Sequence, residues 1–485
     1  MSKIKYKNYI IFGIWTLFAV FLFLFYANIY PLVIFDSDDW GNAGFMRTAL
    51  PSLLFLNPAK ILPETVAPLA SKIGQYVFLP LTGNFIRSMT LAYSLMFTFF
   101  ILLYCLMFDL ALRNLFGLDK SRSLLLTAFF VLFHFSIFRV TPAQNQFLFG
   151  TVNLTCVWHY LIPNIFASAM VLWHICRKNN ALLTSPLQLG IVLFACYLAI
   201  FSNLFSGIIL ASYAAVSLLV NLVKNFRKPS NRTDRCRIIN DIVILCFWII
   251  SLLFEYNGDR AQYFSEFNLQ ASVGNFVNWI FRINKITLLA LLLFVFMGIL
   301  TLMRDKTEKY QLLEPAAECL LCLVITAVFL VLLSARTGGA YIARCDVIFG
   351  VFFYLFLIVL FFAAYAIKHF PQILNIVPLV FFVILSNTLV GTRLYRDINV
   401  LNLHPQSAAA VSNDLVDQVI AADRALLTDV TVYVPMYNSD DNWPQAIYMG
   451  HNFGATLYRH GITSKMMNIT IEPSEEKNIE FNIPR

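Results

Sequence analysis

The chain has 485 residues, of which 59% are hydrophobic and only 13% are charged. A soluble globular protein is about 45–50% apolar and about 25% charged, so this composition excludes that class and predicts a polytopic membrane protein. The formal net charge of +8 does not indicate a nucleic-acid partner, because much of the basic excess lies in short loops between apolar segments, where it sets membrane orientation.

Eleven apolar segments are long enough, or nearly so, to form spanning helices, which need about 20 residues each. They lie near residues 8–30, 88–112, 123–139, 160–176, 187–203, 207–223, 240–256, 284–303, 312–333, 347–367 and 372–391. Three lysines precede the first segment, which predicts an uncleaved signal-anchor with the N-terminus inside. The odd number of spans then places the C-terminus outside, and the short basic loops inside.

An acidic cluster, Asp36-Ser37-Asp38-Asp39-Trp40, follows the first apolar segment at the outer membrane edge. Three carboxylates at this depth are costly unless something uses or solvates them. Neighbouring carboxylates repel each other, so one of them is poised to accept a proton from a hydroxyl group. The alternative is that one of them caps the following helix, but three are more than capping needs.

The rest of the first outer segment, residues 31–87, contains an amphipathic stretch at residues 42–56. We expect this stretch to form a helix that lies along the membrane interface. Lys72 and Arg87 belong to the same segment and are candidate phosphate contacts, with simple solvation or anchoring as the alternative.

A second candidate group is Tyr341-Ile-Ala-Arg344-Cys-Asp346, in the outer loop before the tenth apolar segment. An arginine at the head of a helix near the lipid surface suits a phosphate, which it can bind bidentately. A salt bridge from Arg344 to Asp346, or a snorkelling anchor, is an equally good interpretation.

A third group lies in Trp158-His159-Tyr160-Leu-Ile-Pro163, which follows a loop rich in glutamine and asparagine. Aromatic and polar side chains together suit a sugar, and we expect His159, Trp158, Tyr341 and Trp40 to contact sugar or acceptor. The aromatic belt of membrane proteins is the better explanation for Trp158 and Tyr160 alone, but it explains His159 less easily.

The tail, residues 392–485, has ordinary globular composition. A helical pattern over 407–427 and strand patterns over 431–435 and 466–471 predict a small α/β domain outside the membrane. Residues 1–391 would then form the membrane domain, so the fold class is an all-α polytopic protein with a C-terminal α/β domain.

The sequence contains no Walker motif, no G-x-G-x-x-G after a strand, no H-E-x-x-H and no zinc-ligand spacing. We therefore expect no cofactor, although Asp36, Asp38 and Asp39 offer oxygen ligands for a divalent ion. Cys156 and Cys345 fall in predicted outer loops, which leaves a disulfide between them open. The missing nucleotide motifs favour a donor that is carried by lipid and used outside.

The organisation of the chain resembles GT-C-type glycosyltransferases, and more narrowly the phage-encoded serotype-converting O-antigen glucosyltransferases. The resemblance rests on Asp36-Ser-Asp-Asp-Trp40, Trp158-His-Tyr-Leu-Ile-Pro163, Tyr341-Ile-Ala-Arg344 and Asn442-Trp-Pro444. It implies a multi-pass protein of the bacterial inner membrane with a cytoplasmic N-terminus and a periplasmic C-terminal domain. It also implies undecaprenyl-phosphate-glucose as donor and a lipid-linked O-antigen repeat as acceptor.

By the same resemblance the catalytic base is the first of two adjacent acids, which indicates Asp38 and then Asp39, while the extra Asp36 departs from the pattern. Arg344 would stabilise the leaving lipid phosphate in an inverting single displacement. The alternatives are a GT-C enzyme for another sugar, a flippase for a lipid-linked saccharide, and a non-catalytic assembly partner. Transporters usually carry internal repeats and charges within their spans, which this sequence largely lacks.

Overall fold

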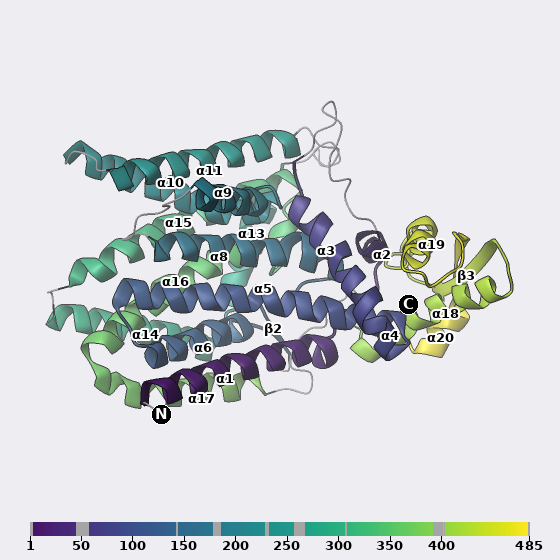
Figure 1. Cartoon of the computed structure of the whole chain (residues 1–485), viewed down its shortest axis with the longest axis horizontal. Helices are drawn as coiled ribbons and strands as arrows, with labels where there is room; N and C mark the ends of the chain where they lie inside the picture. The colour runs from purple at the N-terminus through teal and green to yellow at the C-terminus, as the bar shows by residue number, and fades with distance from the viewer. Residues whose placement is uncertain are drawn as a thin grey trace.

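The computed structural model describes residues 3–44, 58–141, 144–177, 186–227, 232–256, 267–305, 308–390, 401 and 403–483. Within these residues the helices run side by side as a bundle, and the C-terminal region lies at one end of it, opposite the N-terminus (Figure 1). We call the end that carries residues 403–483 the domain end of the bundle.

Nine helical segments in the described residues are long and apolar enough to cross a membrane, which makes this a multi-pass membrane protein. The helices that form them are α1 (Lys3–Leu24), α5 (Phe85–Phe116), α8 (Ile162–Cys176), α10 (Leu204–Arg227), α11 (Arg232–Tyr256), α14 (Lys285–Arg304), α15 (Lys309–Arg336), α16 (Phe349–His369) and α17 (Val377–Thr388). Short π or 3-10 turns extend several of them, namely η1 (Phe25–Ile29), η4 (Val157–Leu161) after α7 (Leu154–Cys156), and η6 (Pro371–Asn375).

All eleven predicted apolar segments coincide with helices, but two are shorter than a full span. These are α6 (Lys120–Ser136) and α9 (Pro186–Ile200), at 17 and 15 residues. Asp119 caps α6 by accepting hydrogen bonds from the N–H groups of Ser121 and Arg122, which fixes the start of this helix at Lys120. The predicted hairpin between α9 and α10 is confirmed, since only three residues separate Ile200 from Leu204.

The ends of the long helices follow ordinary capping chemistry. Asn84 accepts a hydrogen bond from the Arg87 N–H at 2.7 Å and starts α5, which ends at Gly117 in the left-handed conformation. The first helix and its π turn end at Ile29, just before Tyr30-Pro31, and residues 31–35 lead without regular secondary structure to the acidic cluster. Asp36 therefore lies at the domain end of the bundle, a few residues after the first helix.

The interior of the bundle is largely aromatic. The Phe108 and Phe130 rings stack with centroids 4.0 Å apart, and the fully buried His134 stacks on Phe149 at 4.5 Å. There are two short antiparallel strands, β1 (Phe138–Thr141) and β2 (Gln144–Gln146), in which Phe138 pairs with Gln146. The Phe138 ring packs on Trp279 of α13 (Leu269–Phe281). Offset aromatic stacking adds about 0.5–1.5 kcal/mol per pair beyond area burial.

The domain end also carries the short elements that follow the first helix. They are α2 (Ser37–Gly44), α3 (Ile61–Ile73), η3 (Gly74–Phe78) and α4 (Leu79–Thr82). The interfacial helix predicted for residues 42–56 falls almost entirely outside the described residues, and its first three residues belong to α2. The loop before α16 contains the 3-10 turn η5 (Tyr341–Ala343).

The C-terminal region is a small α/β unit, as predicted. Its elements are α18 (Pro405–Arg424), β3 (Asp429–Pro435), η7 (Ile447–Met449), α19 (Gly450–Arg459), β4 (Asn468–Ser474) and α20 (Glu475–Phe481). The strands β3 and β4 are parallel, with Val432 opposite Ile471, and α18 and α20 both pack on β3. The helix and both strands predicted from the sequence are present, displaced by one to three residues at most of their ends.

Candidate active site

The acidic cluster forms the beginning of α2, and its three carboxylates have different surroundings. Asp39 is buried, and its carboxylate accepts four hydrogen bonds: from the N–H groups of Phe35 and Asp36 at 3.0 Å, and from the N–H and hydroxyl of Thr155 at 2.7 and 2.6 Å. The contact to the Asp36 N–H is a helix-capping contact, so one carboxylate does take the capping role. Burial nevertheless raises the pKa of Asp39 to about 6.

Asp36 is fully buried and has only part of its carboxylate engaged. Its Oδ2 accepts a hydrogen bond from the Asn153 amide at 2.7 Å, while its Oδ1 has no hydrogen-bonding partner. Burial, followed by the charge of Asp39, raises the pKa of Asp36 well above its usual value. Asp36 is therefore suited to carry a proton in the folded protein.

Asp38 is the one carboxylate of the three that is exposed to solvent. Its backbone carbonyl accepts a hydrogen bond from the Asn42 amide at 2.9 Å, and the Asn42 Oδ1 lies 3.0 Å from the His159 Nε2. The turn η7, which contains Tyr448 of the C-terminal region, packs on α2, and burial followed by the charge of Asp38 raises the pKa of Tyr448. Asp38 thus lies on an open edge that His159 and Tyr448 border.

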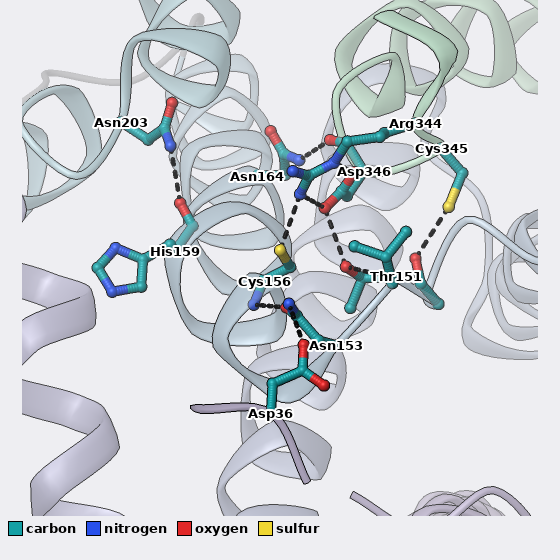
Figure 2. Close-up of polar contacts among 12 residues, drawn as sticks. Asp36, Thr151, Asn153, Cys156, His159, Asn164, Asn203, Arg344, Cys345 and Asp346 are labelled. Carbon is teal, nitrogen blue, oxygen red and sulfur yellow. Dashed lines mark hydrogen bonds and ion pairs between the residues drawn. The ribbon is translucent and has the colours of Figure 1, made fainter. Parts of the chain in front are cut away.

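A chain of buried polar contacts connects the acidic cluster with Arg344, as Figure 2 shows. Asn153 donates to Asp36 and accepts from the Cys156 N–H at 2.8 Å, and the Arg344 Nη2 lies 2.9 Å from the Cys156 sulfur. These residues lie far apart in the sequence, so the fold brings together the two groups that the sequence only predicts to share a membrane face.

Arg344 is held by a bidentate ion pair and by two aromatic rings. Its Nη2 and Nε lie 2.6 and 3.1 Å from the carboxylate oxygens of Asp346, which also accepts a hydrogen bond from Thr151. The guanidinium carbon lies 4.3 Å from the Tyr160 ring centroid and 5.7 Å from that of Tyr341. The salt-bridge interpretation is therefore confirmed, and 22% of the Arg344 side chain remains exposed.

A cavity of about 200 Å³ opens beside these rings at the domain end of α10, α11 and α15. Tyr160 and Tyr341 form part of its wall, and its polar lining includes Lys60, Asn203, Arg336 and the carboxylate Glu255, which lies 3.8 Å from the Lys60 Nζ. The Asn203 amide also donates to the His159 backbone carbonyl at 3.0 Å, which joins the cavity wall to the edge occupied by Asp38 (Figure 2). Cations and aromatic rings in one cavity suit a phosphate attached to a sugar.

The C-terminal region contacts the acidic cluster through two backbone groups and the Gln445 side chain. The Ser37 hydroxyl donates to the Pro444 carbonyl and accepts from the Ala446 N–H, both at 2.7 Å, and the Gln445 amide donates to the Phe35 carbonyl at 2.9 Å. The Trp443–Pro444 peptide bond is cis. The motif Asn442-Trp-Pro444, noted in the sequence, therefore lies against α2.

The remaining predicted site residues occupy more buried or more distant positions. Trp40 is fully buried and packs on Phe453 with centroids 4.4 Å apart, and Trp158 is buried against Tyr93. Their contact with a sugar stays a prediction.

The two predicted cations of the first outer segment both bind backbone carbonyls. Lys72 donates to Arg459 in α19, and burial followed by the charge of Arg459 lowers its pKa. Arg87 donates to the carbonyl of Ala27 near the end of the first helix. Both therefore have structural contacts, and a role in phosphate binding stays a prediction.

Within the described residues, no three histidine, cysteine or acidic side chains come together as a metal site, and this includes the acidic cluster. Cys156 and Cys345 are both free thiols with separate partners, since the Cys345 sulfur donates to the Gly150 carbonyl at 3.0 Å. The disulfide that the sequence leaves open is therefore not formed.

Four residues complete this site without having been predicted as part of it, namely Asn153, Cys156 and Thr151 in the polar chain and Lys60 in the cavity. The first three follow β2 in a short segment with no recognisable motif. The one available signal was a group of polar side chains directly before an apolar span, where an N-cap is the ordinary explanation. Asn153 does cap α7, and it contacts Asp36 through its other amide atom.

Comparison of the chain with protein-family models, with curated proteins and with solved structures found no match.

Proposed function

We propose that this protein is an integral-membrane glycosyltransferase of the GT-C type that acts on the periplasmic side of the bacterial inner membrane. The proposed donor is undecaprenyl-phosphate-glucose and the proposed acceptor is a lipid-linked O-antigen repeat. The choice of glucose and of O-antigen follows from the sequence resemblance. The site supports the general reaction class.

One observation carries this proposal: an exposed carboxylate and a group of cations lie at the same end of the bundle, and a chain of polar contacts connects the acidic cluster with Arg344. Asp38 lies on the open edge, and Arg344 lies beside a cavity with Lys60 and Arg336. Sugar transfer from a lipid phosphate needs this pair of groups, because a hydroxyl must lose its proton while a phosphate gains negative charge.

The reaction is a single displacement. Asp38 takes the proton of the acceptor hydroxyl as its oxygen attacks C1 of the donor sugar. The bond between C1 and the phosphate oxygen breaks, and the lipid phosphate leaves with both bonding electrons. The cavity cations stabilise that developing charge, and one preorganised contact of this kind contributes about 2.7–4 kcal/mol.

The two buried carboxylates have positioning roles in this scheme. Asp39 fixes the first turn of α2 to Thr155, and Asp36 joins the same turn to Asn153. Asp38 lies between them in the sequence, so its backbone is held from both sides while its side chain stays exposed. This arrangement supports Asp38 as the base over either neighbour.

A flippase is less well supported. The described spans do contain a polar cavity away from the domain end, with Asp241, Glu318 and His174 in its lining. Its volume is about 30 Å³, which matches about one water molecule and is far smaller than a saccharide.

The test uses the purified full-length protein with a panel of undecaprenyl-phosphate sugars and lipid-linked saccharide acceptors. We expect transfer from one donor, and Asp38→Asn should reduce the rate about 10²–10⁴-fold without changing thermal stability. Asp440→Asn, at an exposed aspartate of the C-terminal region, is the matched control and should retain full activity. Arg344→Lys keeps the charge but loses the bidentate geometry, so it should weaken use of the donor. Full activity of Asp38→Asn would refute the proposed base, and no transfer from any donor would refute the proposed function.

A further inference from the structure

A long apolar groove runs along the side of the bundle between α1, α6 and α17, with a volume of about 410 Å³. Its lining is almost entirely apolar and includes Trp15, Phe18, Phe25, Phe135 and Phe381. A groove of this kind on a membrane protein faces the hydrocarbon of the bilayer and accepts a flexible apolar chain.

The length of the groove distinguishes between possible chains. Along the first helix its lining extends from Ile14 to Ile29, which at 1.5 Å per residue is about 22 Å. One leaflet contributes about half of the roughly 30 Å hydrocarbon core, or about 15 Å. The groove therefore continues beyond the bilayer midplane, where the acyl chain of a phospholipid from one leaflet ends. A long isoprenoid chain fits this length.

We propose that this groove holds the isoprenoid chain of the acceptor lipid, while the donor lipid uses the cation-lined cavity. This inference rests on the proposed function, which requires two lipid-borne substrates. The two sites belong to different flanks of the bundle: the cavity is lined by α10, α11 and α15, and α11 lies on the side opposite α1 and α17 (Figure 1). Two separate lipid entrances allow donor and acceptor to bind at the same time.

The end of the groove nearest the domain end suits an anionic headgroup. Thr388 and Leu389 line this end, and the Arg139 guanidinium lies 3.3 Å from the carbonyl of Asn387 and 3.5 Å from that of Val390. Arg139 thus places a positive charge beside the groove mouth, where the phosphates of a lipid carrier would lie.

The groove mouth is also connected to the acidic cluster through the chain itself. Ile29 lines the groove and precedes Asp36 by seven residues, which span at most about 25 Å when extended. Several linked sugars cover such a distance. A saccharide that is anchored at the groove mouth can therefore present a hydroxyl group to Asp38.

The proposal is tested with a variant that fills the groove, and the KM is measured separately for the acceptor and for the donor. Ala128 lines the groove on α6, so Ala128→Trp places a bulky ring inside it. The matched control is Leu289→Trp on α14, at a side chain that is 64% exposed outside the groove. We expect Ala128→Trp to raise the KM for a long-chain acceptor at least tenfold. The KM for a short-chain acceptor and the KM for the donor should not change.

A second measurement does not depend on activity. A long-chain isoprenyl pyrophosphate with a photoreactive group is incubated with the full-length protein in a bilayer, and the crosslinked peptides are identified. Labelling of α1, α6 and α17 that Ala128→Trp reduces supports the groove. Labelling of α10, α11 and α15 instead, or an unchanged acceptor KM in Ala128→Trp, overturns the inference while the glycosyltransferase function stands. If the probe labels the groove but no sugar transfer occurs, the proposed function fails, and the assignment to an acceptor fails with it.

Discussion

Replacement of Ser37 by alanine should weaken the contact between the C-terminal region and α2. The Ser37 hydroxyl is buried and makes two hydrogen bonds of 2.7 Å across this interface. In Ser37→Ala the Pro444 carbonyl keeps the Ser37 backbone N–H as a donor, at 2.9 Å, but the Ala446 N–H loses the hydroxyl that it contacts. A buried donor without a partner costs about 1–3 kcal/mol.

This free-energy cost converts into an opening equilibrium that can be measured. At 1.4 kcal/mol per factor of ten, the interface should open about 5- to 150-fold more often. Hydrogen–deuterium exchange of peptides that cover residues 33–40 and 444–450 should accelerate by that factor. Peptides from β3 and β4 should exchange at the wild-type rate, because their pairing lies within the C-terminal region.

The control for this experiment is Ser439→Ala. The Ser439 hydroxyl is exposed and donates to the nearby Trp443 carbonyl at 3.4 Å, a weak contact within the same loop. Wild-type exchange in residues 33–40 of the Ser37→Ala protein would refute the reasoning, as would equal acceleration in both variants. If opening accelerates and sugar transfer also falls, the position of α2 depends on the C-terminal region.

Three further changes test the acidic cluster and its contacts. Asp39→Asn leaves two of the four hydrogen-bond donors without an acceptor but also removes a buried charge. Thermal unfolding should show that the free energy of unfolding falls by about 1–3 kcal/mol. The matched control, Asp38→Asn, should change it by less than about 0.5 kcal/mol. Burial raises the pKa of Asp36, so the folded state binds the Asp36 proton more tightly than the unfolded state does. The stability of the fold should therefore fall as the pH rises from about 4 towards neutral. Asp36→Asn should reduce this pH dependence in thermal-shift measurements. Gly44→Ala would place a methyl group against the Thr456 side chain of α19, so it should cost about 1–3 kcal/mol and promote protease cleavage at the interface; wild-type resistance would contradict this close approach.

The apolar segments and the polar clusters at their ends were predictable from local sequence. Hydropathy alone locates a spanning helix, and the excess of basic residues in alternate loops indicates which end of each helix lies inside. This is why Asp36 and Arg344 could be placed at one membrane face without a structure. The two short helices, α6 and α9, show the limit of this approach, because segment length alone does not distinguish a full span from a shorter packed helix.

The contacts within the site were not predictable, because they depend on residues far apart in the chain. Asn153 lies 117 positions after Asp36, and Cys156 lies 188 positions before Arg344. The burial of Trp40 and Trp158 was equally hidden, since a tryptophan at the end of a span can belong to the aromatic belt or to the protein core. Only the packing of α2 on α19 and of η4 on α5 distinguishes these cases.

The hydrogen bonds from Ser37 to Pro444 and Ala446 have a consequence for how the protein is made. These partners are separated by 407 and 409 residues. At about 5–20 residues per second, a ribosome needs about 20–80 s to synthesise that length after Ser37 has been made. During this interval the acidic cluster lacks the C-terminal groups that cover it in the folded protein. Newly made chains therefore pass through a stage in which α2 has been synthesised and the site is not yet assembled.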